Sequence, residues 1–440
     1  MAKPIVAIVG RPNVGKSTLF NKLVGERIAI VEDTPGVTRD RIIADAEWLN
    51  HHFTLIDTGG IEPKAKDDIL LQMRIQAEIA IDMADLIVHI VDGREGMTAS
   101  DHEVANMIRK QSKPVILAVN KLDSKAMENT IYEFYNLGLG EPVPISAEQG
   151  LGLGDLLDIV IEKVKRVYDE EKQEDGTLKI AVIGKPNAGK STLINKMLGE
   201  DRLIVSNIPG TTRDAVDTKV RFDGQDFTMI DTAGLRRKKK IYDDIERYSI
   251  IRAIAAVDRA DVVLHLVDGV EGVTEQDSKI AGIAHNRHKP TIIIVNKWDA
   301  IEKDNKTMGK MEESVRKTLS FLNYAPMLFI SAKTGQRLTK IFETIRYVHS
   351  QSQKRITTGK LNEAITEFVM LKQPPSKNGR RLKIYYAAQT NVGPPTFVLF
   401  VNDSTLVHFS YQRYLENKLN ETFDFTGTPI RLLIREKAKQ

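Results

Sequence analysis

The 440-residue chain contains one set of motifs twice, in the same order. GRPNVGKSTLFNKLVGE at 10–26 returns as GKPNAGKSTLINKMLGE at 184–200, and the two motif lysines are 174 residues apart (190 − 16). FTLIDTGG at 53–60 returns at the same offset as FTMIDTAG, and the blocks TPGVTRD, LIVHIVDG, VNKLD and PISA also have later counterparts. Because solenoid repeats have much shorter periods, the repeat predicts two tandem domains of one fold.

The segment between the two copies is polar and acidic. It reads RVYDEEKQEDGT at 166–177, a composition typical of linkers. A second polar stretch follows the last helix expected in the second copy, near residue 350. We therefore expect a first domain at 1–165, an acidic linker at 166–177, a second domain at 178–350 and a C-terminal domain at 351–440.

Short runs of Val and Ile alternate with helical stretches within each copy. In the first copy the expected strands cover 5–9, 53–57, 86–92, 115–120 and 143–146. Such runs are typical of strands buried on both faces, so the pattern predicts an α/β domain with a mostly parallel sheet flanked by helices. The C-terminal part differs: a helix at 361–371, strands at 382–389 and 396–401, a helix at 411–421 and a strand at 430–435 predict a small α+β domain.

A glycine-rich phosphate loop follows the first strand of each copy. In the first copy the pattern is Gly10-x-x-x-x-Gly15-Lys16-Ser17, between a strand and a helix, which is the context that this motif requires. The glycines let backbone N–H groups turn toward phosphate oxygens, the lysine supplies a positive charge, and the serine hydroxyl is a ligand for Mg²⁺. Gly184, Gly189, Lys190 and Ser191 repeat the pattern.

Two further motifs of each copy begin where a strand is expected to end. Asp57 and Asp231 start DTGG and DTAG, in which a carboxylate suits Mg²⁺ and the last glycine can donate its N–H to a γ-phosphate. Asp123 and Asp299 end NKLD and NKWD, and a carboxylate there can accept two N–H donors from guanine, which adenine lacks. The guanine nucleotide is therefore expected to contact two sets of residues: Gly10, Arg11, Pro12, Asn13, Val14, Gly15, Lys16, Ser17, Thr18, Asp57, Thr58, Gly59, Gly60, Ile61, Asn120, Lys121, Leu122, Asp123, Ser146 and Ala147, and Gly184, Lys185, Pro186, Asn187, Ala188, Gly189, Lys190, Ser191, Thr192, Asp231, Thr232, Ala233, Gly234, Leu235, Asn296, Lys297, Trp298, Asp299, Ser331 and Ala332.

Charge and composition bound the possible partners and the compartment. The net charge is +4, but residues 351–440 carry 14 Lys and Arg against 7 Asp and Glu, a net of +7. Such a module suits a polyanionic partner, although a merely basic, soluble domain explains the charge equally well. The chain has no cysteine, no apolar run long enough for a membrane helix and no signal peptide, so a cytoplasmic location is expected.

These motifs, in this order and twice over, resemble the P-loop GTPases of the translation-factor class. The tandem arrangement with a small basic C-terminal domain resembles the bacterial ribosome-assembly GTPase family Der (EngA), in the Era/EngA-like group, over essentially the whole chain. The resemblance implies GTP hydrolysis, a KH-like third domain, the large ribosomal subunit and its rRNA as partners, no membrane, and a monomer. It also implies that Thr38 and Thr212, in the TRD blocks, are switch threonines.

The motifs and the resemblance together assign the chemistry to particular residues. Catalytic roles are expected at Lys16, Thr38, Asp57, Gly60, Lys190, Thr212, Asp231 and Gly234, and magnesium ligands at Ser17, Thr38, Ser191 and Thr212. In some relatives the asparagine of the phosphate loop helps to hold K⁺, which makes Asn13 and Asn187 candidate K⁺ ligands; the alternative is that each asparagine only braces its loop.

Two departures from common GTPase patterns bear on the mechanism. The residue after DxxG is Ile61 or Leu235, whereas many GTPases have a glutamine there to orient the attacking water. The resemblance then implies the hydrophobic-substituted GTPases, and weak intrinsic turnover is expected. The C-terminal domain also lacks the GxxG loop with which KH modules clamp a nucleotide backbone, so the sequence does not establish whether this domain contacts RNA by the usual KH geometry.

Other features leave alternatives open. RRKKK at 236–240 is either an rRNA contact exposed by nucleotide state or a solvated basic segment. Arg39 and Arg213 suit a catalytic role or a local loop role equally, whereas His89 and His265 are interpreted as core histidines. A P-loop kinase of small molecules and an RNA-binding protein with decayed nucleotide sites are the rival functions. NKxD argues against the first, and the retained site residues argue against the second.

Overall fold

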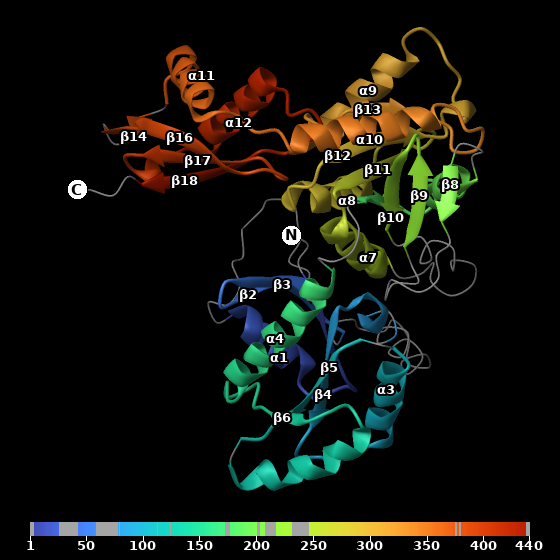
Figure 1. The fold of residues 1–440 in the computed structure, drawn as a ribbon, viewed down its shortest axis with the longest axis vertical. Coiled ribbons are helices and arrows are strands. Elements are labelled where there is room, and N and C mark those ends of the chain that lie inside the picture. The colour runs from blue at the N-terminus through green and yellow to red at the C-terminus, as the bar shows by residue number, and fades with distance from the viewer. Residues whose placement is uncertain are drawn as a thin grey trace. The chain divides into compact units, whose positions relative to one another are not determined.

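A computed structural model describes most of the chain. It covers residues 4–25, 43–58, 78, 80–111, 113–123, 125–171, 177–199, 203–206, 217–230, 246–374, 376–377 and 380–436. The chain divides into two compact units, residues 1–176 and 177–440 (Figure 1).

The described part of the first unit contains one six-stranded sheet with the order β2-β3-β1-β4-β5-β6. Its strands are β1 (Ile5–Val9), β2 (Ile43–Trp48), β3 (His51–Asp57), β4 (Leu86–Asp92), β5 (Val115–Asn120) and β6 (Pro142–Pro144). Neighbouring strands are parallel, except for the antiparallel pair of β2 with β3. The strand order reverses at β1, which pairs with β3 on one side and β4 on the other. Ligands of parallel α/β sheets bind at the carboxyl ends of the strands at such a point.

Helices cover both faces of this sheet. On one face lie α1 (Lys16–Gly25) and α4 (Leu153–Glu171), and on the other lie α3 (Ala99–Arg109) and the 3₁₀ segment η2 (Lys125–Leu137). In β1, Ile8 packs toward α1 and α4, whereas Ala7 and Val9 pack toward α3. Both sets of side chains are buried, and this explains the unbroken apolar run of the strand.

The second unit repeats this architecture with one strand more among the described residues. Its seven-stranded sheet has the order β13-β12-β11-β7-β10-β9-β8. The strands are β7 (Leu178–Ile183), β8 (Leu203–Ser206), β9 (Thr218–Phe222), β10 (Gln225–Met229), β11 (Val262–Asp268), β12 (Thr291–Asn296) and β13 (Met327–Phe329). All pairs are parallel except β8 with β9 and β9 with β10.

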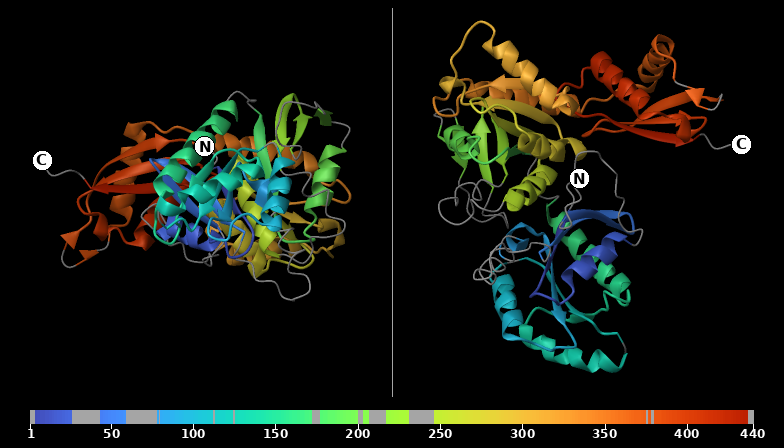
Figure 2. Two further views of the ribbon diagram at one scale, coloured as in Figure 1. Left: turned by 90° about the horizontal axis from the view of Figure 1, so that it is seen from below. Right: turned by 180° about the vertical axis from the view of Figure 1, so that it is seen from behind.

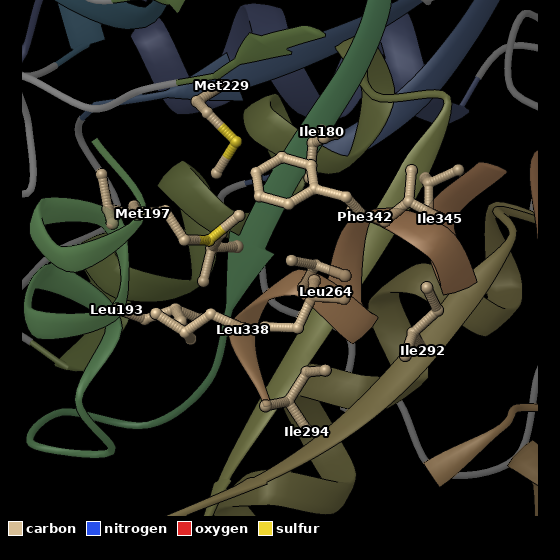
Figure 3. Close-up of a cluster of buried hydrophobic side chains, with 14 of the residues drawn as sticks. Ile180, Leu193, Met197, Met229, Leu264, Ile292, Ile294, Leu338, Phe342 and Ile345 are labelled. Atoms are coloured by element: carbon tan, nitrogen blue, oxygen red, sulfur yellow. The ribbon is translucent and has the colours of Figure 1, made fainter. Parts of the chain in front are cut away.

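The core of this repeated fold lies between its sheet and its helices. The helices are α5 (Lys190–Leu198), α7 (Glu246–Arg259), α8 (Glu275–Asn286), α9 (Thr307–Thr318) and α10 (Leu338–Ser352), with the short 3₁₀ segments η3 (Trp298–Ala300) and η4 (Ser320–Leu322). Figure 3 shows Phe342 of α10 pointing into a cluster that includes Met197 of α5, Met229 of β10 and Leu264 of β11. The cluster fixes α5, and with it the loop that precedes α5, against the sheet.

The C-terminal part of the second unit is a separate α+β arrangement. It consists of α11 (Thr358–Leu371), the two-residue strands β14 (Ser376–Lys377) and β15 (Arg380–Arg381), β16 (Ile384–Asn391), β17 (Thr396–Val401), the 3₁₀ turn η5 (Ser404–Leu406), α12 (Phe409–Phe423) and β18 (Arg431–Glu436). β17 pairs antiparallel with β16 and parallel with β18. Both helices lie on one face of this three-stranded sheet (Figures 1 and 2).

A glycine turn joins this C-terminal part to the repeated fold. The backbone N–H of Thr291 donates to the Gly427 carbonyl at 2.8 Å, and the Gly427 N–H donates to the Tyr324 carbonyl at 2.7 Å. Gly427 has φ 79°, and a Cβ atom there would lie 2.4 Å from a methyl group of Val348. Only glycine fits this left-handed, close-packed position without strain.

The predicted fold class is confirmed, while some boundaries differ. The strand expected at 143–146 ends at Pro144, since Ser146 instead pairs with Leu151 in an isolated bridge. Helix α4 continues to Glu171, so the expected linker begins inside a helix, whose residues 166–171 have no glycine or proline to end it earlier. No helix in the described part of the chain is long and apolar enough to cross a membrane.

Candidate functional site

The phosphate loop of each copy depends on left-handed backbone positions. Asn13 has φ 63° and Gly15 has φ 98°, and Asn187 and Gly189 have φ 62° and 99°. Glycine adopts such angles without strain, and asparagine tolerates them better than most residues. The loop therefore has one shape in both copies, set by the glycines and asparagines that the motif repeats.

The lysine of each phosphate loop lies inside its own loop. Lys16 Nζ donates to the Arg11 carbonyl at 2.6 Å, and Lys190 Nζ donates to the Gly184 and Lys185 carbonyls at 2.5 and 2.7 Å. Burial lowers the pKa of Lys16 to about 8, partly offset by the negative charge of Asp57. An ammonium group that donates to loop carbonyls at the start of a helix is well placed to gain from an anionic phosphate.

Ser17 and Asp57 bring a hydroxyl and a carboxylate together at the carboxyl end of β3. The Ser17 hydroxyl donates to Asp57 Oδ2 at 2.6 Å, and Asp57 is fully buried. Oxygen ligands of this kind suit Mg²⁺, so the pair fits the ion that the sequence predicts. In the second copy Ser191 occupies the corresponding start of α5, whereas Asp231 lies outside the described residues.

The asparagine of each NKxD motif connects the phosphate loop to the SA loop. Asn120 Nδ2 donates to the Val14 carbonyl at 2.7 Å, and Asn120 Oδ1 accepts from the Ala147 N–H at 2.9 Å. In the second copy Asn296 makes the same two bonds, to Ala188 and from Ala332, both at 2.9 Å. Both asparagines are 2% exposed, so each is a buried structural link between three motifs that are distant in sequence.

The same link explains the second glycine of the phosphate loop. A Cβ atom at Gly15 would lie 2.3 Å from Asn120 Nδ2, and one at Gly189 would lie 2.2 Å from Asn296 Nδ2. No side chain fits between loop and amide, so glycine is required by the close approach as well as by the backbone angle.

The lysine of each NKxD motif pairs with the aspartate that ends the neighbouring strand, and in the first copy it also donates to the phosphate loop. Lys121 Nζ donates to the Asn13 carbonyl at 2.7 Å and pairs with Asp92 at 2.6 Å; Lys297 Nζ pairs with Asp268 at 2.5 Å. Burial alone would raise the pKa values of these two carboxyls, but the lysine hydrogen bonds lower them below the ordinary value. The sequence analysis did not single out these aspartates, although both end a VD block that the repeat contains.

The aspartates expected to select the base differ in their surroundings. Asp123 accepts a hydrogen bond from the Ser146 hydroxyl at 2.6 Å and also contacts the Arg94 guanidinium. A hydrogen bond from Ser331 lowers the pKa of Asp299. The residue of the second copy that corresponds to Arg94 is the exposed Val270, so this arginine contact belongs to the first copy's motif.

The structure brings most of the predicted residues together in each copy. The phosphate loop, the NKxD motif and the SA loop lie at the carboxyl ends of β1, β5 and β6, or of β7, β12 and β13. His89 and His265 are fully buried in β4 and β11, and burial lowers the pKa of each to about 4, which leaves them neutral core residues. The predictions that lie outside the described residues are Thr38, Gly59, Gly60, Ile61, Thr212, Asp231, Thr232, Ala233, Gly234, Leu235, Arg39, Arg213 and the basic run at 236–240.

Comparisons with known proteins agree with this geometry. The family model described as 50S ribosome-binding GTPase matches residues 5–121 and 179–297. The model of the KH-domain-like C-terminal part of EngA bacterial GTPase enzymes matches residues 355–435. The GTPase Der of Agathobacter rectalis is 61% identical over 440 residues and covers 99% of each chain. The GTPase Der of Clostridium botulinum is 59% identical over 442 residues and covers 100% of each chain.

The predicted architecture and activity are thereby confirmed. Two tandem GTPase domains precede a KH-like domain, and members of this class of GTPase bind their guanine nucleotide together with Mg²⁺. Full-length identity near 60%, with both nucleotide sites built alike, leaves one conclusion. The chain belongs to the Der (EngA) family of GTPases, which hydrolyse GTP to GDP and phosphate.

Proposed function

We propose that this GTPase is a switch in the assembly of the large (50S) ribosomal subunit, and that its nucleotide state controls its binding to the ribosomal particle. The observation that carries the proposal is that a buried asparagine joins the phosphate loop to the base motif in both copies, in a chain whose GTPase domains match the 50S ribosome-binding model. A cytoplasmic location and a monomeric state complete the proposal.

In the proposed nucleotide site, the phosphate loop holds the phosphates and its lysine neutralises them. Lys16 and Lys190 leave the loop carbonyls that now accept their ammonium protons and bind the β- and γ-phosphates. Ser17 and Ser191, with Thr38 and Thr212, hold Mg²⁺, which adds positive charge to the phosphate oxygens when bound. Asp57 is placed to hold the Ser17 hydroxyl and the hydrated ion in register, since it already accepts that hydroxyl proton.

Base selection in this proposal depends on Asp123 and Asp299. Each carboxylate is held by a serine of the SA loop, which leaves oxygen lone pairs for the N1 and exocyclic amine protons of guanine. In the first domain the guanine must displace the Arg94 guanidinium from Asp123. This competition weakens guanine binding at the first site. The valine at the corresponding position of the second site does not compete for the carboxylate.

Hydrolysis is the attack of water on the γ-phosphate. The buried lysine and the loop N–H groups stabilise the charge that develops there. Ile61 and Leu235 have no group that can orient water, so slow turnover follows unless another positive charge assists. We assign that assistance to K⁺ near Asn13 and Asn187, which are exposed at the rims of their loops.

Coupling to the ribosome is proposed to use the two basic parts of the chain. The basic run at 236–240 begins two residues after the switch glycine Gly234, so its position is expected to follow the γ-phosphate. Residues 351–440 add a net charge of +7 (14 − 7). Phosphate contacts of this kind release counterions, so the affinity for rRNA should fall steeply with salt.

The test is pelleting of variants with purified large subunits at two salt concentrations. Replacement of residues 236–240 by neutral residues should weaken pelleting, and deletion of residues 355–440 should weaken it further. Both losses should be smaller at the higher salt concentration, because salt also weakens the phosphate contacts of the unchanged chain. Pelleting that neither change reduces would refute the proposed route of coupling, and small-subunit particles provide the specificity control.

A further inference from the structure

Each copy contains a buried aspartate beside the phosphate loop that neither the motifs nor the family description assigns to the site. Asp101 and Asp277 are 0% exposed and occupy the third position of α3 and α8. Asp101 Oδ2 accepts the N–H and hydroxyl of Thr98 at 3.0 and 2.8 Å, and Asp277 Oδ2 accepts those of Thr274 at 2.9 and 2.7 Å. These bonds cap the helix, but a helix cap requires neither full burial nor a negative charge.

A buried cation of the phosphate loop faces each of these carboxylates. Arg11 Nε lies 3.3 Å from the Asp101 carboxylate, and Lys185 Nζ lies 3.4 Å from Asp277 Oδ2. The Arg11 and Lys185 side chains are only 12% and 4% exposed. Arginine in one copy and lysine in the other show that the contact preserves charge rather than a particular shape.

The same cationic residue also holds the lysine that binds phosphate. The carbonyls that accept Lys16 Nζ at 2.6 Å and Lys190 Nζ at 2.7 Å belong to Arg11 and Lys185. The side chain of this residue thus anchors the start of the loop to α3 or α8, while its carbonyl positions the phosphate-binding ammonium. This anchor joins the phosphate loop to a helix on the other face of the sheet. The asparagine link does not contact that helix.

We propose that Asp101 and Asp277 are positioning residues for the two nucleotide sites, which fix the start of each phosphate loop through a buried ion pair with Arg11 or Lys185. The inference rests on the phosphate-binding role proposed above for Lys16 and Lys190. Glu95 and Glu271 also pair with Arg11 and Lys185, at 2.8 and 2.9 Å, but their side chains are 59% and 60% exposed, so they remain solvated. The buried carboxylate is the partner inside the fold, and loss of its charge leaves the buried side of the cation without compensation and shifts the loop. Shifts near 1 Å in a reacting site lower rates by up to about 100-fold.

The test uses the full chain and separates the ion pair from the helix cap. In Asp101→Asn the amide oxygen still accepts the Thr98 N–H, so the cap survives while the charge is lost. Thr98→Ala is the matched control, because it weakens the cap and leaves the ion pair intact. Each variant is made with Lys190→Ala, which silences the second site, and kcat/KM for GTP and Kd for GDP are measured at the first site.

We expect Asp101→Asn to lower kcat/KM about 10- to 100-fold and to raise Kd for GDP, while Thr98→Ala stays within about twofold. In an Arg11→Met background, Asp101→Asn should have little further effect, because its partner is already gone. Equal losses for Thr98→Ala and Asp101→Asn, or an undiminished Asp101→Asn effect in that background, would overturn the inference.

The second copy keeps the proposal testable if Asp101→Asn does not fold. Asp277→Asn, with Thr274→Ala as its control and Lys16→Ala to silence the first site, should give the same pattern. The Lys→Ala background variants distinguish a failure of the proposed phosphate role from a failure of the positioning role. If Lys190→Ala leaves GDP binding at the second site unchanged, the proposed phosphate role fails; if it abolishes binding but Asp101→Asn has no effect, only the positioning role fails.

Discussion

Asn296→Ala tests the buried link that holds the second nucleotide site together. Asn296 is 2% exposed and makes two hydrogen bonds of 2.9 Å, to the Ala188 carbonyl and from the Ala332 N–H. Alanine leaves both backbone groups buried without these partners. A buried polar group without a partner costs about 1–3 kcal/mol, so the two together should lower the free energy of unfolding by about 2–6 kcal/mol.

The assay is calorimetric unfolding of the full chain, read on the transition of residues 177–440, together with titration of GDP. For a unit of this size each kcal/mol lowers Tm by about 2–4 °C. GDP affinity at the second site should also fall, because the phosphate loop and the SA loop lose their common anchor. Asn305→Ala, at an exposed asparagine of the same unit, is the control and should change neither quantity. An Asn296→Ala protein with wild-type Tm and wild-type GDP affinity would refute the link.

Four further predictions concern the chemistry of the sites. Asp299→Asn should shift the second site from guanine toward xanthine nucleotides, whose base has a carbonyl where guanine has an amine; unchanged GTP affinity would show that this carboxylate does not select the base. Replacement of Na⁺ by K⁺ at constant ionic strength should raise turnover, and Asn13→Ala or Asn187→Ala should reduce that response; a rate indifferent to the cation removes K⁺ from the mechanism. Burial lowers the pKa of Lys16 to about 8, so its charged fraction in the nucleotide-free protein falls above that pH. GDP affinity at the first site should therefore decline above pH 8, and a flat profile contradicts the role of this charge. Arg94→Val should tighten GDP binding at the first site about two- to fivefold, since an exposed ion pair is worth about 0–1 kcal/mol; weaker binding would mean that the arginine helps to hold the base.

Most of the architecture could be predicted because each motif and each apolar strand pattern of the repeat occurs twice. The expected strands at 5–9, 86–92, 115–120 and 396–401 have the predicted bounds, since each is a short apolar run between polar residues. β2 and β9 were harder to recognise, because IADAEW and TKVRF carry charged residues and neither strand is buried throughout. The helical continuation of α4 into the acidic segment was also missed, because that segment's composition is as suitable for an exposed helix as for a linker.

The site was predicted as a set of motifs, while its internal connections needed the fold. The sequence pointed to the base-selecting aspartates, but not to the Asn120 link, the Asp92–Lys121 pair or the Arg94 contact with Asp123. These contacts join segments that are distant along the chain, so no local spacing reveals them. Asp101 could have been recognised from the sequence, because TASD at 98–101 and TEQD at 274–277 are helix-capping patterns that occur at corresponding places in both copies.

Co-sedimentation measures directly whether nucleotide state controls binding to the large ribosomal subunit. The full chain is pelleted with purified large subunits in the presence of GTP, GDP or a non-hydrolysable GTP analogue, at one salt concentration. We expect strong pelleting with the analogue, release with GDP, and an intermediate result with GTP that declines as hydrolysis proceeds. Equal pelleting in GDP and in the analogue would show instead that the contact of this GTPase with the ribosome does not depend on its nucleotide.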